Sequence, residues 1–345
     1  LKIIMAKINE LLENKFDKID YSHLLENHIW IFKERMNCII SPDSDGLLCG
    51  LFMSYYFNWE IVGYYDGKVL IVKKSISCFD DDVCFLDMEI CREKVKSVGH
   101  HMLLYNTNQI PNDWNKWFKN CIQPNIIRNY DGMHTFRLKY PLATIHLLLA
   151  IIGNKYDIKI PESAICPLLF TDGTFNVLFS YPENVLNWLN FFDINNKKNP
   201  LRTLFLNERL SVFRLMQAMD SFFRKRDAIS IVKERGDRLR ISNTDGSPYN
   251  IENKNDVFYI NHDAKNRIER FINILSDLTE WKYNEKNWCF SNMCLYKFTK
   301  GDFLNKKWNL TNSNYNKFID LNPLSWAMTS GNNIEFTLEE PDNLP

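Results

Sequence analysis

The chain has 345 residues, of which 45% are hydrophobic and 24% are charged. These fractions are typical of globular proteins and exclude a disordered tail, a collagen-like fibre and a mini-protein. Lysine plus arginine and aspartate plus glutamate both number 42, so the net charge is zero. Such a chain lacks the positive field of a general duplex-binding protein, and any contact with nucleic acid has to be local.

Nine cysteines form no CxxC pair, and most of them lie inside apolar runs. This pattern is typical of reduced cysteines buried in a cytoplasmic protein rather than of disulfides or a zinc site. The most apolar stretch, residues 142–152, is well short of the roughly 20 residues that cross a bilayer. We therefore expect a cytoplasmic protein without a membrane contact, and the sequence leaves its oligomeric state open.

Hydrophobic periodicity alternates along the chain in the way expected of an α/β fold. Helical spacing covers residues 5–34, 47–57, 140–152, 162–170 and 182–192. Short apolar runs bounded by Gly, Asp or Asn predict strands near 37–41, 61–64, 68–72, 83–87 and 98–105. The first half is therefore predicted to be a mainly parallel sheet flanked by helices.

The polar segment 195–200, which ends in Pro200, is the best linker candidate in the chain. It divides the chain into a predicted α/β domain over 1–195 and a second, smaller α+β domain over 200–345. In the second part, residues 204–225 and 264–281 have the spacing of long amphipathic helices, and 334–338 has a strand pattern. We expect this C-terminal domain to bind substrate or to act as a lid.

Acidic residues close several of the predicted strands. Asp43 and Asp45 follow the first strand, directly before Gly46, and Asp87 ends a later apolar run. Carboxylates at the carboxyl ends of parallel strands lie where open α/β folds bind ligands. Burying an acid there is costly unless it is paired or holds a cation. The alternative for Asp43 and Asp45 is a solvated turn or a calcium-type loop.

Two histidines and a further acid complete the set of candidates. His100 and His101 stand at the edge of the next apolar run, and Asp172 closes another one before Gly173. Neighbouring residues on a strand point to opposite faces, so both rings can serve one site only at a strand end or in a turn. The alternatives are structural roles for the rings and a helix cap for Asp172. Oxygen ligands combined with imidazole suit Mn²⁺ or a similar divalent ion.

The order of these motifs resembles the DHH phosphoesterase superfamily, which includes RecJ-type exonucleases, oligoribonucleases, cyclic-dinucleotide phosphodiesterases and manganese-dependent pyrophosphatases. The resemblance covers roughly residues 36–180: Asp-x-Asp-Gly, a lone Asp, His-His, and a Tyr-Pro-Leu-Ala-Thr segment leading to Asp-Gly. Two features depart from the family pattern. Gly99 stands where an acid precedes the histidines, and the histidine that often precedes the first acid is missing.

The resemblance implies that all six matching residues form one catalytic centre. Their implied roles are Asp43 as ligand of one metal ion, Asp45, His100 and Asp172 as ligands of a second, Asp87 as the bridge, and His101 as a contact to the scissile phosphate. The implied cofactors are two Mn²⁺ or Mg²⁺ ions of unequal affinity, because the first site lacks its histidine. The implied reaction is hydrolysis of a phosphodiester in single-stranded or short nucleic acid or in a nucleotide.

Basic residues gather between 202 and 240, with phenylalanines among them. Such a stretch can grip a phosphodiester backbone, and Arg224 and Arg226 are the predicted substrate contacts. The alternative is an amphipathic helix with a solvated basic face, since acids dilute the charge. For the whole chain, the rival hypothesis is a non-catalytic nucleotide- or partner-binding protein that retains a degenerate DHH fold.

Overall fold

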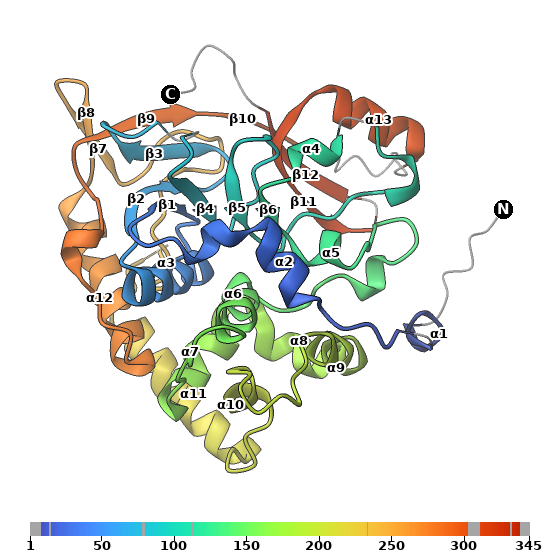
Figure 1. Cartoon of the computed structure of the whole chain (residues 1–345). Helices are drawn as coiled ribbons and strands as arrows, with labels where there is room; N and C mark the ends of the chain where they lie inside the picture. The colour runs from blue at the N-terminus through green and yellow to red at the C-terminus, as the bar shows by residue number, and fades with distance from the viewer. Residues whose placement is uncertain are drawn as a thin grey trace.

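The structure is a computed structural model that describes residues 8–13, 15–77, 80–111, 114–232, 234–302, 311–331 and 333–338. Its main sheet consists of β1 (Asn37–Ile40), β2 (Glu60–Tyr65), β3 (Val69–Lys73), β4 (Val83–Leu86), β5 (Lys96–Val98), β6 (Cys121–Ile122), β7 (Ile251–Lys254), β8 (Val257–Ile260) and β9 (Met293–Lys297). The strand order is β6-β5-β4-β1-β2-β3-β9-β8-β7 (Figure 1). The first five strands in this order run parallel, and the other four extend the sheet antiparallel. The predicted mainly parallel sheet is thus confirmed for the centre of the molecule.

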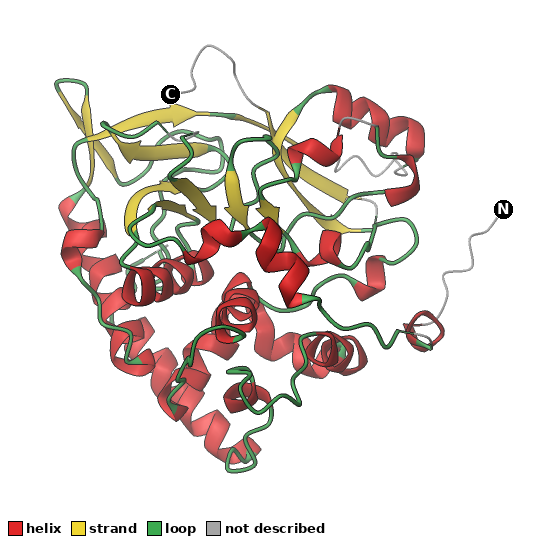
Figure 2. Cartoon of the chain, in the orientation of Figure 1, coloured by secondary structure: helices red, strands yellow, loops and turns green. Residues whose placement is uncertain are grey.

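Most helices lie together in a layer on one side of the sheet (Figure 2). The helices are α1 (Ile8–Leu12), α2 (Tyr21–Asn27), α3 (Ser44–Phe57), α4 (Trp114–Trp117), α5 (Pro124–Ile127), α6 (Thr144–Gly153), α7 (Ile165–Phe170), α8 (Thr174–Ser180), α9 (Pro182–Phe191), α10 (Arg202–Phe205), α11 (Val212–Asp227), α12 (His262–Thr279) and α13 (Asn312–Asp320). α3 follows β1 closely and contacts β1, α6 and α12. It is buried almost all round, as its apolar sequence from Leu47 to Met53 requires.

The part of the chain beyond residue 200 contributes to both sheets. It forms a small antiparallel sheet of β10 (Thr299–Asp302), β12 (Asn333–Leu338) and β11 (Pro323–Ser330), in this order. It also supplies β7, β8 and β9 to the main sheet, where β9 covers the edge of β3. The main sheet therefore contains strands from both sides of the predicted boundary at 195–200. One hydrophobic core includes Leu47 of α3 and Phe271 of α12 and extends through both parts.

Two predicted elements differ from the structure. The single helix expected over 204–225 is divided into α10 and α11, because the Ser211 hydroxyl accepts the N–H of Arg214 and starts a new helix. The strand expected over 98–105 ends at Val98, because the N–H of Met102 donates to the Glu89 carboxylate instead of to a neighbouring strand. The helical pattern over 5–34 begins outside the described residues. Within the described residues it gives α1 and α2.

The eight cysteines that the structure describes are unpaired, and six of them are buried. Cys78 lies outside the described residues. Within the described ranges, none of the helices combines the length and the apolar character that a membrane crossing requires.

Candidate metal centre

The carboxyl ends of β1, β4 and β5 deliver acidic and histidine side chains to one edge of the main sheet. Asp87 follows β4 in a left-handed conformation (φ 61°), and its N–H donates to the Val98 carbonyl of β5 at 2.8 Å. His100 and His101 follow β5 at the end of the strand, so both rings can face one site. Asp172 comes from a short helical turn over Thr171–Gly173 and is also left-handed (φ 49°).

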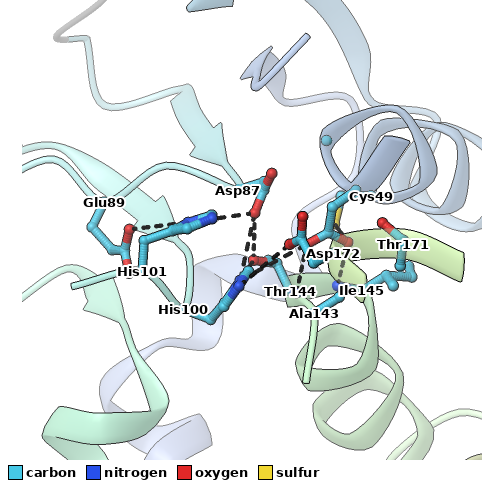
Figure 3. A network of polar contacts seen from close by, with 12 residues as sticks. Cys49, Asp87, Glu89, His100, His101, Ala143, Thr144, Ile145, Thr171 and Asp172 are labelled. Atoms are coloured by element: carbon cyan, nitrogen blue, oxygen red, sulfur yellow. Dashed lines mark hydrogen bonds and ion pairs between the residues drawn. The ribbon is translucent and has the colours of Figure 1, made fainter. Parts of the chain in front are cut away.

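Asp87, His100, His101 and Asp172 form the group that we call the Asp–His cluster (Figure 3). One donor atom from each of the four residues lies within 4.8 Å of those of the other three. His100 places Nε2 at 3.3 Å from Asp172 Oδ2 and Nδ1 at 3.6 Å from Asp87 Oδ1. His101 Nδ1 lies 3.8 Å from the same Asp87 oxygen. Segments far apart in the sequence thus meet at one point, as the order of the motifs predicts.

Asp45 lies beside the cluster and joins α3 to α6. Its two carboxylate oxygens accept the N–H groups of Thr144 at 2.6 Å and Ile145 at 3.1 Å. One of them lies 3.8 Å from His100 Nδ1. The Thr144 hydroxyl donates to Asp87 Oδ1 at 2.8 Å and contacts His100 Nδ1 at the same distance. Asp45 is therefore brought to the site, but its oxygens already satisfy the first turn of α6.

Asp43 caps α3 at the rim of the site. Its Oδ1 accepts the N–H groups of Asp45 and Gly46, at 3.2 and 3.3 Å. Its Oδ2 lies 3.9 Å from Arg238 Nη2. Asp43 is not a member of the Asp–His cluster, but it lines the same cleft as Asp87 and His101. The predicted ligand roles of Asp43 and Asp45 stay predictions.

Position 46 requires glycine because the backbone of Ser41 passes close to the first turn of α3 and leaves no room for a side chain. A Cβ added at Gly46 would lie 2.0 Å from the Ser41 carbonyl oxygen, whereas one at Gly50 of the same helix would meet side chains at 3.2 to 3.4 Å. We expect Gly46→Ala to lower the free energy of unfolding by about 1–3 kcal/mol despite the better helix propensity of Ala, and to weaken metal binding. Urea denaturation measures the loss, and Gly50→Ala is the matched control. Equal stability of the two variants would contradict this account of the turn.

Buried carboxyl groups collect at the site. Burial raises the pKa of Asp45 and of Asp87, and repulsion from neighbouring acids raises both further. Burial also raises the pKa of Asp172. The pKa of His100 is lowered, first by burial and then by the nearby His101, so its ring is neutral near pH 7. A neutral imidazole beside carboxylates is a donor set for a divalent cation.

The chemistry of these donors fits a metal ion. Asp87 Oδ2 is buried and has no hydrogen-bond partner among the described residues. Burying a carboxylate oxygen without a partner costs free energy, because the lost hydration is not replaced. A bound ligand at this oxygen would replace it. Together with the convergence of the cluster, this orphaned oxygen means that the buried Asp and His residues could hold a metal ion.

A cleft of about 460 Å³ opens beside the cluster. Its floor includes Asp87 and His101, one wall is the segment 238–244, and another is formed by residues of β11 and β12. The wall segment is fixed to the strand ends, because the Leu239 N–H donates to the Pro42 carbonyl at 2.8 Å. Lys68, Arg238 and Arg240 bring positive charge to this cleft. The cleft thus places these cationic side chains beside the Asp–His cluster, together with the acids Asp43, Asp66 and Glu335.

The predicted substrate contacts Arg224 and Arg226 do not line this cleft. Arg224 pairs with Asp220 at 2.8 Å on the exposed face of α11. Arg226 pairs with Asp227 at 2.6 Å, and its guanidinium lies 4.8 Å from the centre of the Phe223 ring. Both arginines therefore lie away from this cleft, whereas Arg238 and Arg240 line it. The substrate contacts of Arg224 and Arg226 stay a prediction. The basic composition of 202–240 indicated this region but could not select among its arginines.

Glu89 is a residue of the site that the sequence analysis missed. It lies two positions after Asp87, is 1% exposed, and lines the cleft. Its carboxyl group fills the space next to Gly99, the position where the motif resemblance implies an acid. Glu89 and a side chain at position 99 would compete for the same place.

Comparisons of this chain with protein-family models, with curated proteins and with solved structures find no match. The likeness to the DHH superfamily therefore remains a likeness of motifs. The geometry of the Asp–His cluster and its cleft is the basis for assigning a function.

Proposed function

We propose that this chain is a divalent-metal-dependent phosphoesterase of the DHH type that hydrolyses a phosphodiester in a short or single-stranded nucleic acid or in a nucleotide. The observation that carries the proposal is the convergence of four donor residues within 4.8 Å, next to a cleft with cationic residues on its walls. Phosphoester hydrolysis needs both parts: a cation at the reacting group and donors for the phosphoryl oxygens. The cytoplasmic location remains a prediction from the cysteine pattern.

Asp87, His100 and Asp172 would hold the principal ion, which we propose to be Mn²⁺ or Mg²⁺. When bound, a divalent ion supplies a water of lowered pKa and neutralises charge on the phosphoryl oxygens. His101 has 35% of its side chain exposed and lines the cleft, so its ring can take part in binding the ion or the substrate. Arg238, with 58% of its side chain exposed, also lines the cleft and can pair with a phosphoryl oxygen.

Mn²⁺ binding is expected to occur in two unequal steps. The Asp–His cluster offers four donors, whereas Asp43 brings one carboxylate whose Oδ1 already caps α3. A calorimetric titration should show a tight and a weak event, and phosphodiesterase activity on bis(4-nitrophenyl) phosphate should follow the weak one. Absence of any Mn²⁺ binding at millimolar concentration would overturn the metallohydrolase proposal.

Arg238 is expected to bind the substrate phosphate. Arg238→Glu should raise KM about tenfold, the loss of one charge-assisted contact, and weaken the dependence of KM on salt. The matched control is Arg224→Glu, which breaks an exposed ion pair away from the cleft and should leave KM unchanged. If the control raises KM as much as Arg238→Glu does, the cleft is not the place where substrate binds.

The rival function is a non-catalytic nucleotide- or partner-binding protein with the same fold. The specific observation in its favour is that Asp43 and Asp45 already cap α3 and α6, respectively, through their carboxylates. Under this hypothesis a nucleotide binds to the cleft with equal affinity in Mn²⁺ and in EDTA, and it is not hydrolysed. Equilibrium dialysis with a radiolabelled nucleotide in both buffers separates the two functions.

A further inference from the structure

Glu89 makes three contacts from a fully interior position. Its Oε1 accepts the N–H of Met102 at 2.8 Å and the side-chain amide of Gln123 at 3.4 Å. Its Oε2 lies 3.9 Å from His101 Nδ1, and Figure 3 shows this ring between Glu89 and Asp87. A carboxylate with 1% exposure is costly to bury, so its neighbours have to stabilise the charge. The His101 ring lies on the Oε2 side of this carboxylate.

The absence of a side chain at position 99 is a consequence of this arrangement. Gly99 is not among the glycines with positive φ, so its backbone does not require glycine. A Cβ added there would lie 2.6 Å from Glu89 Cδ and 2.7 Å from Oε2, which is too close for any real contact. Gly99 therefore makes room for the Glu89 carboxylate, and an acid at position 99 would put its own carboxylate close to the same spot.

We propose that Glu89 is the positioning residue of His101. The Glu89 carboxylate, which lies on the Nδ1 side of the ring, favours the Nδ1–H tautomer and fixes the orientation of the ring. The other nitrogen, Nε2, then carries the lone pair of the ring and can face a metal ion. Partners of this kind typically change activity or metal affinity 10- to 100-fold when they are removed. The effect on turnover rests on the proposed function, whereas the effect on the ring does not.

Four variants test this role against a purely structural one. Glu89→Gln keeps the acceptor for Met102 but removes the charge, and Glu89→Ala removes both. Gly99→Asp alone should clash with Glu89 and lower Tm, whereas the double variant Glu89→Ala/Gly99→Asp puts a carboxylate back from the other side. Glu93→Gln, an exposed acid four positions further on, is the matched control.

The readouts are the tautomer of His101 from long-range ¹⁵N NMR of the imidazole nitrogens, and kcat on bis(4-nitrophenyl) phosphate with Mn²⁺. We expect Glu89→Gln to leave Tm close to that of the wild type, to mix the tautomers of His101 and to lower kcat about 10- to 100-fold at unchanged KM. The double variant should recover at least tenfold of the kcat that Glu89→Ala loses, and should restore the Nδ1–H tautomer.

An unchanged His101 signal in Glu89→Gln would overturn the positioning role. The positioning role would also be overturned if the double variant showed the same mixture of His101 tautomers as Glu89→Ala. An inactive wild-type protein would count against the proposed function alone, because the NMR readout still decides the role of Glu89.

Discussion

Asp87→Asn is expected to abolish Mn²⁺ binding at the Asp–His cluster and, with it, any phosphodiesterase activity. The Asp87 carboxylate faces both histidine rings at 3.6 and 3.8 Å, and its other oxygen has no partner among the described residues. Asn has the same size and tolerates the left-handed conformation at this position, so the fold should persist while the charge is lost. By calorimetry, Mn²⁺ affinity should fall more than about 100-fold, beyond the usual effect of removing an outer-shell partner.

A matched control for this variant is Asp193→Asn. Asp193 also has a positive φ, at 56°, and it pairs with Lys18 at the surface, away from the cleft. It should bind Mn²⁺ like the wild-type protein. Wild-type Mn²⁺ affinity in Asp87→Asn would show that the cluster is not the metal site.

The metal-free protein is expected to lose stability as the pH rises through the raised pKa values of its buried carboxyl groups, and Mn²⁺ is expected to remove this loss. The folded state raises the pKa of Asp45, Asp87 and Asp172, first through burial and then through repulsion from neighbouring acids. Between the ordinary pKa near 4 and the raised values, the folded state therefore holds more protons than the unfolded state. Stability then falls with rising pH. Mn²⁺ binds the ionised carboxylates and displaces these protons.

Histidines with a lowered pKa act in the opposite direction but at lower pH. The pKa values of His28 and His146 are lowered to about 4, mainly by burial, so these residues destabilise the fold only below the ordinary histidine value of 6.5. Above about pH 7 they are largely neutral in both states and contribute little slope. A fall in stability with rising pH is therefore the effect of the raised carboxyl groups and not of these histidines.

Two measurements check this pH dependence. Thermal unfolding in EDTA and in Mn²⁺ should give Tm values that diverge as the pH rises. Calorimetry in two buffers of different ionisation enthalpy should show proton release when Mn²⁺ binds, and Asp45→Asn should reduce that release. A metal-free Tm that does not fall with rising pH, with no proton release, would mean that these carboxyl groups are already ionised without metal.

The parts of the site that follow directly from strand ends could be predicted from the sequence. Asp87 and the histidine pair close apolar runs, and the parallel sheet brings those strand ends to one edge. Asp172 could be predicted from the order of the motifs, although its left-handed turn has no periodic signal. The parallel centre of the sheet follows from the alternation of apolar runs and helices in the first half.

Other parts depend on long-range packing that periodicity does not encode. Arg238 reaches the cleft because Leu239 is hydrogen-bonded to Pro42, almost 200 positions earlier in the chain. Glu89 is inside because the chain after His101 turns back onto it. β9 pairs with β3 although the polar segment 195–200 lies between them in the sequence. The unpaired N–H and C=O groups of an edge strand can pair with any strand that reaches them. None of these pairings has a local signature in composition or spacing.

The central claim is that the Asp–His cluster binds a catalytic divalent cation, and anomalous diffraction from crystals soaked in MnCl₂ tests it most directly. Data collected at the manganese absorption edge locate the ion without assumptions about its ligands. The strongest peak should lie between Asp87, His100 and Asp172, at about 2.0–2.3 Å from their donor atoms, with a weaker second peak toward Asp43. Absence of a peak at the cluster after soaking at millimolar Mn²⁺ would contradict the claim.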